Sequence, residues 1–346
     1  MSFVVLNQPL SQKISQTGTA RPRLGFLGVG WIGRHRMEAI AKSGLADIVA
    51  IADPAQNLLS QAAASVPDAV LVESLDALLE VGVDGVVIAT PSALHAEQAI
   101  AALERGVSVF CQKPLGRNEA ETQRVIDAAR AADRLLGVDL SYRHMTQVKK
   151  ICELIRSGEL GNVYVVDLMF HNAYGPDKAW FYDPKLSGGG CVIDLGVHLI
   201  DLALWCLDYP QVTHVTSRLF AQGKPIRSKS KQVEDYAVAR IDLDNGATLQ
   251  LSCSWKLPAG CDAIIGASFF GTKGGASVRN IGGSFYNFVA ERFHGTKCEL
   301  LAATPEEWGG KAAVDWTMRL SESTKFNPQI QGLARVAATL DAIYAR

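Results

Sequence analysis

The sequence predicts an α/β protein of two domains, a doubly wound parallel sheet followed by an α+β domain with an open, mostly antiparallel sheet. From Arg23 to about Leu140, short β-branched runs alternate with longer amphipathic stretches, which is typical of βαβ units. After a helical stretch at Met145–Arg156, runs with strand character follow one another without helices between them. A chain of 346 residues is also long for one hydrophobic core. We expect a polar, mobile leader over 1–22, a first domain over 23–144 and a second domain over 145–346.

The first domain contains six expected strands. They are Leu24–Leu27, Ile48–Ala52, Val70–Val72, Val86–Ala89, Val107–Phe110 and Leu135–Val138. Helices are expected between them, for example at Ala93–Glu104 and Asn118–Ala132. Right-handed crossovers bring the carboxyl ends of such strands to one edge of the sheet, where ligands bind. Thr90-Pro91 and Gln112-Lys113-Pro114 follow two of these ends, so we expect cofactor and substrate to meet there.

The second domain is expected to hold a sheet with helices on one face. Its predicted strands are Val163–Phe170, Thr213–Leu219, Tyr236–Leu243 and Thr248–Trp255. Asp244-Asn245-Gly246 is a hairpin turn signal between the last two, and Ile330–Tyr344 is predicted to be an amphipathic helix. The uncovered face of such a sheet is a natural place for a partner subunit.

Composition excludes several classes of function. The net charge of −1 and the lack of a basic block argue against nucleic-acid binding. We find no apolar run of about 18–20 residues and no signal-peptide pattern, which predicts a cytoplasmic protein without a membrane role. The seven cysteines are scattered and form no C-x-x-C pair, so we expect neither a metal site nor a redox dithiol.

A glycine-rich turn near the N-terminus predicts a dinucleotide site. The pattern G-x-G-x-x-G lies between an expected strand and an expected helix, and an acid ends the next strand, 20 residues past the last glycine. The residues expected to contact the cofactor here are Gly28, Gly30, Trp31, Ile32, Gly33 and Asp53. Asp53 would bond the adenosine ribose and repel a 2′-phosphate, and Pro54 offers a phosphate no partner, which favours NAD over NADP.

A second motif predicts acid–base chemistry. Gly188-Gly189-Gly190 precedes a helical stretch in which Asp194 and His198 stand four residues apart and therefore on one face. A carboxylate beside an imidazole orients the ring and stabilises its protonated form, as a general base requires. The glycines would let a substrate or backbone approach the helix closely. Seen alone, the pattern is more often that of an ordinary helix histidine behind capping glycines.

Taken together, these motifs resemble the glucose–fructose oxidoreductase/inositol dehydrogenase/MocA family. The resemblance runs from Arg23 to the C-terminus and rests on the glycine pattern, Thr90-Pro91 with His95, Gln112-Lys113-Pro114, and the Asp194/His198 motif. It implies a Rossmann domain, an open-sheet domain that builds homodimers or homotetramers, and hydride transfer between a nicotinamide and a hydroxyl-bearing carbon of a sugar or cyclitol. In one departure, Gln112 stands where the family usually has glutamate before Lys-Pro.

The resemblance also suggests roles for individual residues. His198 would be the base, Asp194 would orient it, and Lys113 would stabilise negative charge on the reacting oxygen. Oxidation should then rise with pH through a pKa near neutrality. Further cofactor contacts are expected from Thr90, Pro91, His95 and Gln112. Substrate contacts are expected from Tyr142, Arg143, His171, Asn172, Trp180, Asp201 and Tyr236, each with a structural role as the alternative.

The leading interpretation is an NAD-dependent dehydrogenase that acts on a sugar or cyclitol. Two alternatives stay open: an NAD-dependent glycosidase that uses transient oxidation, and a non-catalytic cofactor-binding sensor. Because a sensor need not keep Lys113, Asp194 and His198 together, the sequence favours an enzyme.

Overall fold

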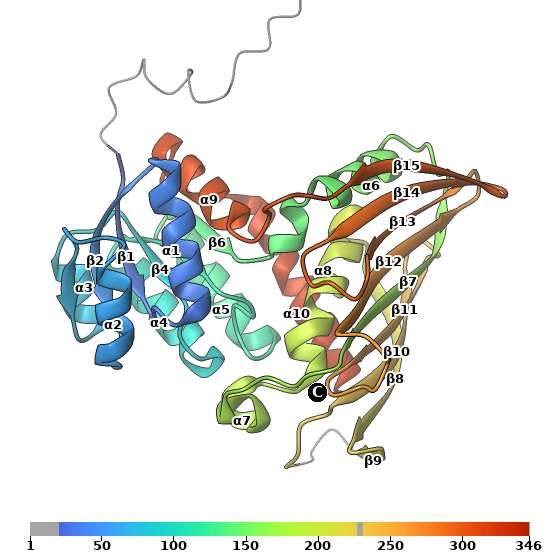
Figure 1. Cartoon of the computed structure of the whole chain (residues 1–346), viewed down its shortest axis with the longest axis horizontal. Coiled ribbons are helices and arrows are strands. Elements are labelled where there is room, and N and C mark those ends of the chain that lie inside the picture. The colour runs from blue at the N-terminus through green and yellow to red at the C-terminus, as the bar shows by residue number, and fades with distance from the viewer. Residues whose placement is uncertain (1–20, 227–230, 346) are drawn as a thin grey trace, which may run out of the picture.

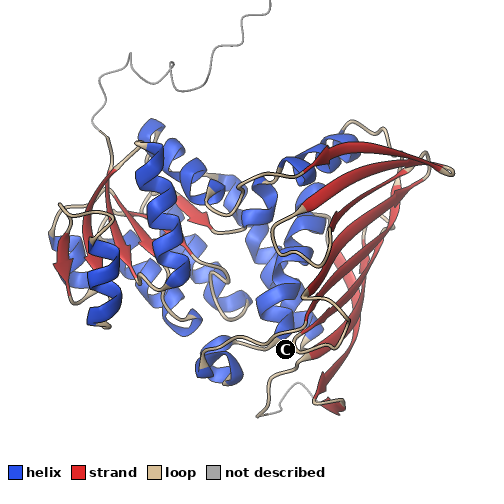
Figure 2. Ribbon diagram, viewed as in Figure 1, coloured by secondary structure: helices blue, strands red, loops and turns tan. Residues whose placement is uncertain are grey.

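The computed structural model describes residues 21–226 and 231–345, so only the last two residues of the expected leader fall within it. Within this range the first domain is a parallel sheet in the order β3-β2-β1-β4-β5-β6, with helices on both faces (Figures 1 and 2). The doubly wound fold is therefore confirmed. Its elements are β1 (Arg23–Leu27), α1 (Trp31–Ser43), β2 (Asp47–Ala52), α2 (Gln56–Ala63), β3 (Val70–Val72), α3 (Leu75–Glu80), β4 (Gly85–Ile88), α4 (Ser92–Glu104), β5 (Ser108–Cys111), α5 (Glu119–Ala131) and β6 (Leu136–Val138).

The second domain is built on a large sheet in the order β15-β14-β13-β12-β7-β11-β10-β8-β9. Among the described strands of this sheet, only β7 and β11 pair in parallel, which confirms that the sheet is mostly antiparallel. Its strands are β7 (Val163–Asn172), β8 (Val212–Ala221), β9 (Lys224–Ile226), β10 (Tyr236–Leu243), β11 (Thr248–Ser254), β12 (Ala263–Gly271), β13 (Gly275–Asn280), β14 (Phe288–His294) and β15 (Lys297–Ala303). Its helical elements are η3 (Ser141–His144), α6 (Thr146–Arg156), η4 (Ala179–Tyr182), α7 (Pro184–Ser187), η5 (Val192–Gly196), α8 (Val197–Cys206), α9 (Lys311–Glu322), η6 (Pro328–Gln331) and α10 (Gly332–Ile343).

The two faces of the large sheet differ. Figure 2 shows helices along one face and, in the described part of the chain, none along the other. The alternation of side chains places Val166, Leu168 and Phe170 of β7 in the core beneath α6, α8 and α10. Residues of the opposite parity, such as Met169 and Val238, lie on the uncovered face and are 42% and 37% exposed.

The C-terminal part of the chain returns to the first domain. Trp316 and Leu320 of α9 pack with Leu24 and Phe26 of β1, and the rings of Trp316 and Phe110 lie 5.6 Å apart. Although α9 follows the large sheet in sequence, it completes the core on one face of the parallel sheet. The chain beyond residue 144 thus contributes α9 to the core of the first domain.

One segment, Pro184–Cys206, is long and apolar enough to cross a membrane by length and composition. The search for apolar runs in the sequence did not identify it. Of its apolar window, 83% is buried inside the molecule, where α8 packs against β7 and β11. Such burial is typical of the core helix of a soluble protein.

Candidate active site

The turn between β1 and α1 contains three glycines with different surroundings. Gly28 has a φ of +86°, and a Cβ there would lie 2.6 Å from the carbonyl oxygen of Ala89. A Cβ at Gly33 would lie 2.1 Å from the carbonyl oxygen of Gly28, so loop and helix are in direct contact. A Cβ at Gly30 would meet nothing within 4 Å. The surface above Gly30 is thus open at the N-terminus of α1, where backbone N–H groups lack intrahelical partners.

Asp53 ends β2 beside this turn. Its two carboxylate oxygens accept hydrogen bonds from the backbone N–H groups of Val29 and Ala55, both at 2.9 Å. Each oxygen keeps further lone-pair capacity for a ribose hydroxyl. Ile32 is half-buried, while Trp31 is 65% exposed and flanks the open surface. An open helix N-terminus next to a carboxylate acceptor fits a dinucleotide.

The turns after β4 and β5 are held together by His95. Its two ring nitrogens each lie 2.7 Å from a carbonyl oxygen, those of Thr90 and Pro114, and the side chain is buried. Burial lowers the pKa of His95, and the two carbonyl oxygens oppose that shift. The structure therefore corrects the expected cofactor contact: His95 faces the two turns instead of open space. The Thr90 hydroxyl donates to Gln98, and Pro91 caps α4.

Lys113 and Asp194 form an ion pair between the two domains. Lys113 Nζ donates to the Asp194 Oδ1 atom and to the Asp194 backbone oxygen, both at 2.7 Å. The Trp255 indole donates to Asp194 Oδ2 at 3.0 Å. The carboxylate is thus bound to Lys113 and Trp255, and it makes no hydrogen bond to His198 in the described part of the chain. This corrects the expected Asp194–His198 dyad.

His198 lies next to this ion pair. Its Nδ1 atom is buried and unpaired among the described residues, and its ring centroid lies 5.0 Å from that of Tyr142. Burial lowers the pKa of His198 well below its ordinary value, and the positive charges of Lys113 and Arg36 lower it further. The imidazole is therefore neutral at neutral pH, and the expectation of a pKa near neutrality is corrected downward.

The glycine turn before Asp194 packs against side chains rather than leaving space for a ligand. Glu234 Oε1 accepts hydrogen bonds from the backbone N–H groups of Gly190 and Val192 at 3.0 and 2.9 Å, and from the Tyr344 hydroxyl at 2.6 Å. A Cβ at Gly189 would lie 2.1 Å from that hydroxyl oxygen. The chain then forms one π turn, η5, which carries Asp194. Glycine is required here because Glu234 and Tyr344 approach the backbone so closely.

Arg143 and Asp201 pair with each other at the middle of α8, two turns past Asp194. Arg143 Nε donates to Asp201 Oδ2 at 2.7 Å, a second bond joins Nη2 to Oδ1, and Nη2 also donates to the Tyr209 hydroxyl at 2.6 Å. Asp201 is 1% exposed. Both carboxylate oxygens of Asp201 are engaged by Arg143, which matches the structural alternative for Asp201.

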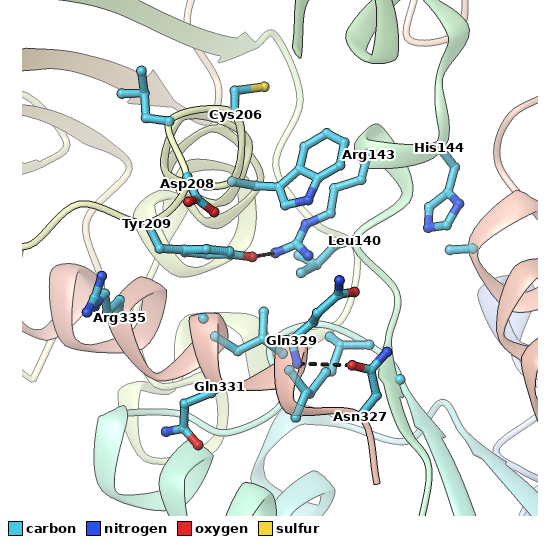
Figure 3. A pocket seen from close by; sticks show the side chains of 18 of the residues that line it. Leu140, Arg143, His144, Cys206, Asp208, Tyr209, Asn327, Gln329, Gln331 and Arg335 are labelled. Carbon is cyan, nitrogen blue, oxygen red and sulfur yellow. Dashed lines mark hydrogen bonds between the residues drawn. The ribbon is translucent and has the colours of Figure 1, made fainter. Parts of the chain in front are cut away.

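Arg143 also lines a cavity of about 1200 Å³ between the domains. Figure 3 shows Arg143 pointing toward Tyr209 there, with Gln329 and Asn327 hydrogen-bonded across from them. Lys113, Asp194 and His198 do not line this cavity. We regard it as an interdomain groove separate from the candidate active site.

The other residues expected at the substrate are dispersed. His171 and Tyr236 lie on the uncovered side of the large sheet, with their rings stacked 5.7 Å apart, and His171 bonds Ser254. The side chain of Asn172 accepts a hydrogen bond from the Tyr174 N–H and so closes a turn. The structure does not bring these three residues to Lys113. For His171 the alternation of side chains along β7 already indicates this, because Phe170 faces the core and its neighbour must face away.

Trp180 lies closer to the candidate site. It belongs to the short η4 turn and stacks on Phe181 with ring centroids 3.8 Å apart. Phe181 and Tyr182 in turn pack edge-on against Trp255, the donor to Asp194. The segment therefore places an aromatic wall beside the Lys113–Asp194 pair.

Sequence reasoning missed the residues that act through long-range contacts. Trp255, Glu234 and Tyr344 support Asp194 or its turn, and Arg36 and Asp139 form a buried ion pair behind Gln112. Only Asp139 had a local signal, a carboxylate directly after an expected strand of the parallel sheet. No group of three or more histidine, cysteine, aspartate or glutamate side chains that could hold a metal ion occurs within 21–226 and 231–345.

Comparisons with known proteins agree with the Rossmann fold and with the mostly antiparallel sheet that follows it. Residues 23–140 match the model of an oxidoreductase family with an NAD-binding Rossmann fold, and residues 148–277 match the GFO/IDH/MocA C-terminal domain. The rhizopine catabolism protein MocA of Rhizobium meliloti is 31% identical over 75% of this chain and 78% of its own. D-glucoside 3-dehydrogenase of Escherichia coli is 30% identical, over 58% of this chain and 60% of its own. The crystal structure of GenD2 from gentamicin A biosynthesis, in complex with NAD, has a TM-score of 0.79 at 24% identity and covers 95% of both chains.

Proposed function

Since this chain belongs to the GFO/IDH/MocA family and is an NAD(P)-dependent oxidoreductase, we propose that it oxidises a secondary or anomeric hydroxyl of a sugar or cyclitol. The observation that carries this proposal is the Lys113–Asp194 pair beside the neutral, unpaired His198. A fixed cation next to an available base suits the removal of a proton from a hydroxyl group.

The cofactor would be held by the first domain. Gly28, Gly30 and Gly33 with the N-terminus of α1 would bind its phosphates, and Asp53 would bind its ribose. When bound, the nicotinamide accepts the hydride from the substrate carbon.

Lys113 would bind the oxygen of the substrate hydroxyl, and His198 would accept its proton. The Lys113 ammonium has three N–H groups, of which two are used on Asp194, so the third can bind the substrate oxygen. His198, neutral at physiological pH, would take the hydroxyl proton. As the proton leaves, negative charge on the oxygen is stabilised by the ammonium. Asp194 and Trp255 would hold Lys113 in place throughout.

A ring-hydroxylated substrate suits the surroundings of this pair. Trp180 and the neighbouring aromatic residues of η4 offer flat apolar faces, while Lys113 and His198 offer polar contacts. The dehydrogenase relatives are named for sugars or inositol, as in D-glucoside 3-dehydrogenase and inositol 2-dehydrogenase 4.

We propose a preference for NAD over NADP on the basis of Asp53. Its carboxylate would repel a 2′-phosphate, and Arg34, the nearest candidate partner for one, is bonded to Gln61 at 2.6 Å. Asp53→Ala should narrow the difference in catalytic efficiency between the two cofactors. Equal or better use of NADP by the unaltered enzyme would contradict this preference.

We also propose that the uncovered face of the large sheet joins copies of this chain. Met169 and Val238 expose apolar surface there. Met169→Asp should then reduce the mass measured by light scattering, whereas Leu71→Asp, on the first domain, should not. The mass of a single chain for the unaltered protein at micromolar concentration would contradict the proposal.

A cytoplasmic location fits the free thiols of all seven cysteines, five of which are buried.

The direct test is absorbance at 340 nm with NAD and a panel of pyranoses and cyclitols. We expect NADH to accumulate with at least one of them. Release of an aglycone from a glycoside without net NADH would indicate the glycosidase alternative. Binding of NADH without turnover of any compound would indicate the sensor.

A further inference from the structure

Asp139 is a buried carboxylate at the centre of a hydrogen-bond network behind Lys113. It follows β6 and is 2% exposed. Its Oδ2 atom accepts from Arg36 Nε and from Gln112 Nε2, both at 2.5 Å, and its Oδ1 atom accepts from the Ser141 hydroxyl at 2.5 Å. Arg36 also donates to Ser141 at 3.1 Å. Arg36, Gln112 and Ser141 are themselves buried.

Each of the three donors is adjacent to a residue of the candidate site. Arg36 lies in α1, three residues after Gly33; Gln112 immediately precedes Lys113; and Ser141 immediately precedes Tyr142, whose ring packs on His198. One carboxylate thus connects the dinucleotide turn, the lysine turn and the aromatic neighbour of the base. A shift of Asp139 would therefore move all three.

The charges of the network balance only because position 112 is neutral. Arg36 and Asp139 form a buried ion pair, and the Gln112 amide donates to the carboxylate without adding charge. A glutamate at 112 would place a second carboxylate against Asp139, where like charges repel strongly at low dielectric. Gln112 Nε2 and Arg36 Nε donate to the same oxygen of Asp139. A glutamate oxygen in the place of Gln112 Nε2 would therefore lie next to the guanidinium of Arg36.

We propose that Asp139 is the positioning residue for Lys113 and α1, and that it carries the buried negative charge that a glutamate at position 112 would otherwise supply. The inference rests on the proposed function only in the role given to Lys113. It requires that one of the two positions, 112 or 139, carries a negative charge and that the other is neutral.

The test is a double-mutant cycle read out by NADH affinity, measured from nicotinamide fluorescence, with thermal unfolding in parallel. Gln112→Glu and Asp139→Asn should each weaken NADH binding about tenfold or more, because one doubles the buried negative charge and the other leaves Arg36 uncompensated. The combined variant Gln112→Glu/Asp139→Asn should return to within about threefold of the unaltered protein. Asp76→Asn, which breaks an exposed ion pair, serves as the control and should change nothing.

A combined variant no better than the poorer single variant, or singles that bind NADH normally, would overturn the proposal. If Asp139→Asn alone does not fold, Gln112→Glu and the combined variant still test the proposal. It requires that the combined variant bind NADH more tightly than Gln112→Glu. Restored affinity in a protein that oxidises no polyol would refute the proposed substrate and leave the role of Asp139 standing.

Discussion

The helical run from Val192 to Cys206 carries two ion pairs with different surroundings, Lys113–Asp194 near its first end and Arg143–Asp201 two turns farther along. At the first end, Lys113–Asp194 keeps an unused N–H and lies beside His198, whose Nδ1 is buried without a partner in the described structure. Farther along, Arg143 is bonded twice to Asp201 and once to Tyr209, and it stacks on Trp205. The first pair is open toward an unpaired histidine, whereas the second is closed around a buried carboxylate, and this contrast supports the proposal that the active site lies at the first pair.

The largest effect should follow from changing the open pair or the histidine beside it. Lys113→Ala and His198→Ala should each lower turnover by about 10²–10⁴-fold, because one removes charge stabilisation and the other the base. NADH affinity should stay nearly unchanged, since phosphates and ribose are bound by the first domain. Steady-state rates with the best polyol and nicotinamide fluorescence measure the two quantities. His294→Ala, an exposed histidine, is the control, and near-normal turnover in His198→Ala would make Lys113 the base.

Changing the closed pair should affect stability instead. Asp201→Asn leaves the buried Arg143 without its counter-charge and should lower the free energy of unfolding by about 3–5 kcal/mol. Turnover per folded molecule should remain within severalfold of normal. Urea denaturation measures the stability, and rates at low temperature measure the turnover of the folded protein. As a control, Asp76→Asn should lower the free energy of unfolding by no more than about 1 kcal/mol. A stable Asp201→Asn variant with strongly reduced turnover would remove the distinction between the two pairs.

A smaller effect is expected from Trp255, which supports Asp194 from the sheet. Trp255→Phe removes the indole donor to Asp194 Oδ2 and should reduce turnover about three- to tenfold by loosening the hold on Lys113. Trp316→Phe is a matched control, because its indole N–H is buried without a partner among the described residues. Equal rates for Trp255→Phe and the unaltered enzyme would show that Lys113 alone positions Asp194.

The parts of this site that arise from local chain geometry were predictable from sequence. The spacing of Gly28, Gly30 and Gly33 predicted the turn between β1 and α1, and the turn signal at 244–246 predicted the β10–β11 hairpin, whose Gly246 has a φ of +86°. The Asp194–His198 contact failed as a prediction because Lys113 and Trp255, distant in sequence, bind both carboxylate oxygens. Helical spacing shows which residues share a face, but it does not show what approaches that face.

The large sheet shows the same limit. Strands β12 to β15 were not predicted, and their positions depend on pairing with β7 and with one another. The packing of α9 on the first domain also depends on contacts far apart in the chain, such as Trp316 with Phe110. Segments whose place depends on such partners carry little local signal.

The pH dependence of kcat/KM tests the central claim that an unpaired His198 beside Lys113 is the base. Because burial and the charges of Lys113 and Arg36 lower the pKa of His198, its neutral form persists below the ordinary value of 6.5, and oxidation should decline only as pH falls under that value. In Lys113→Ala one of those charges is lost, so the acid limb should move upward toward 6.5. In His198→Ala the limb should vanish. An acid limb at or above 6.5 in the unaltered enzyme, or the same limb in His198→Ala, would contradict this account.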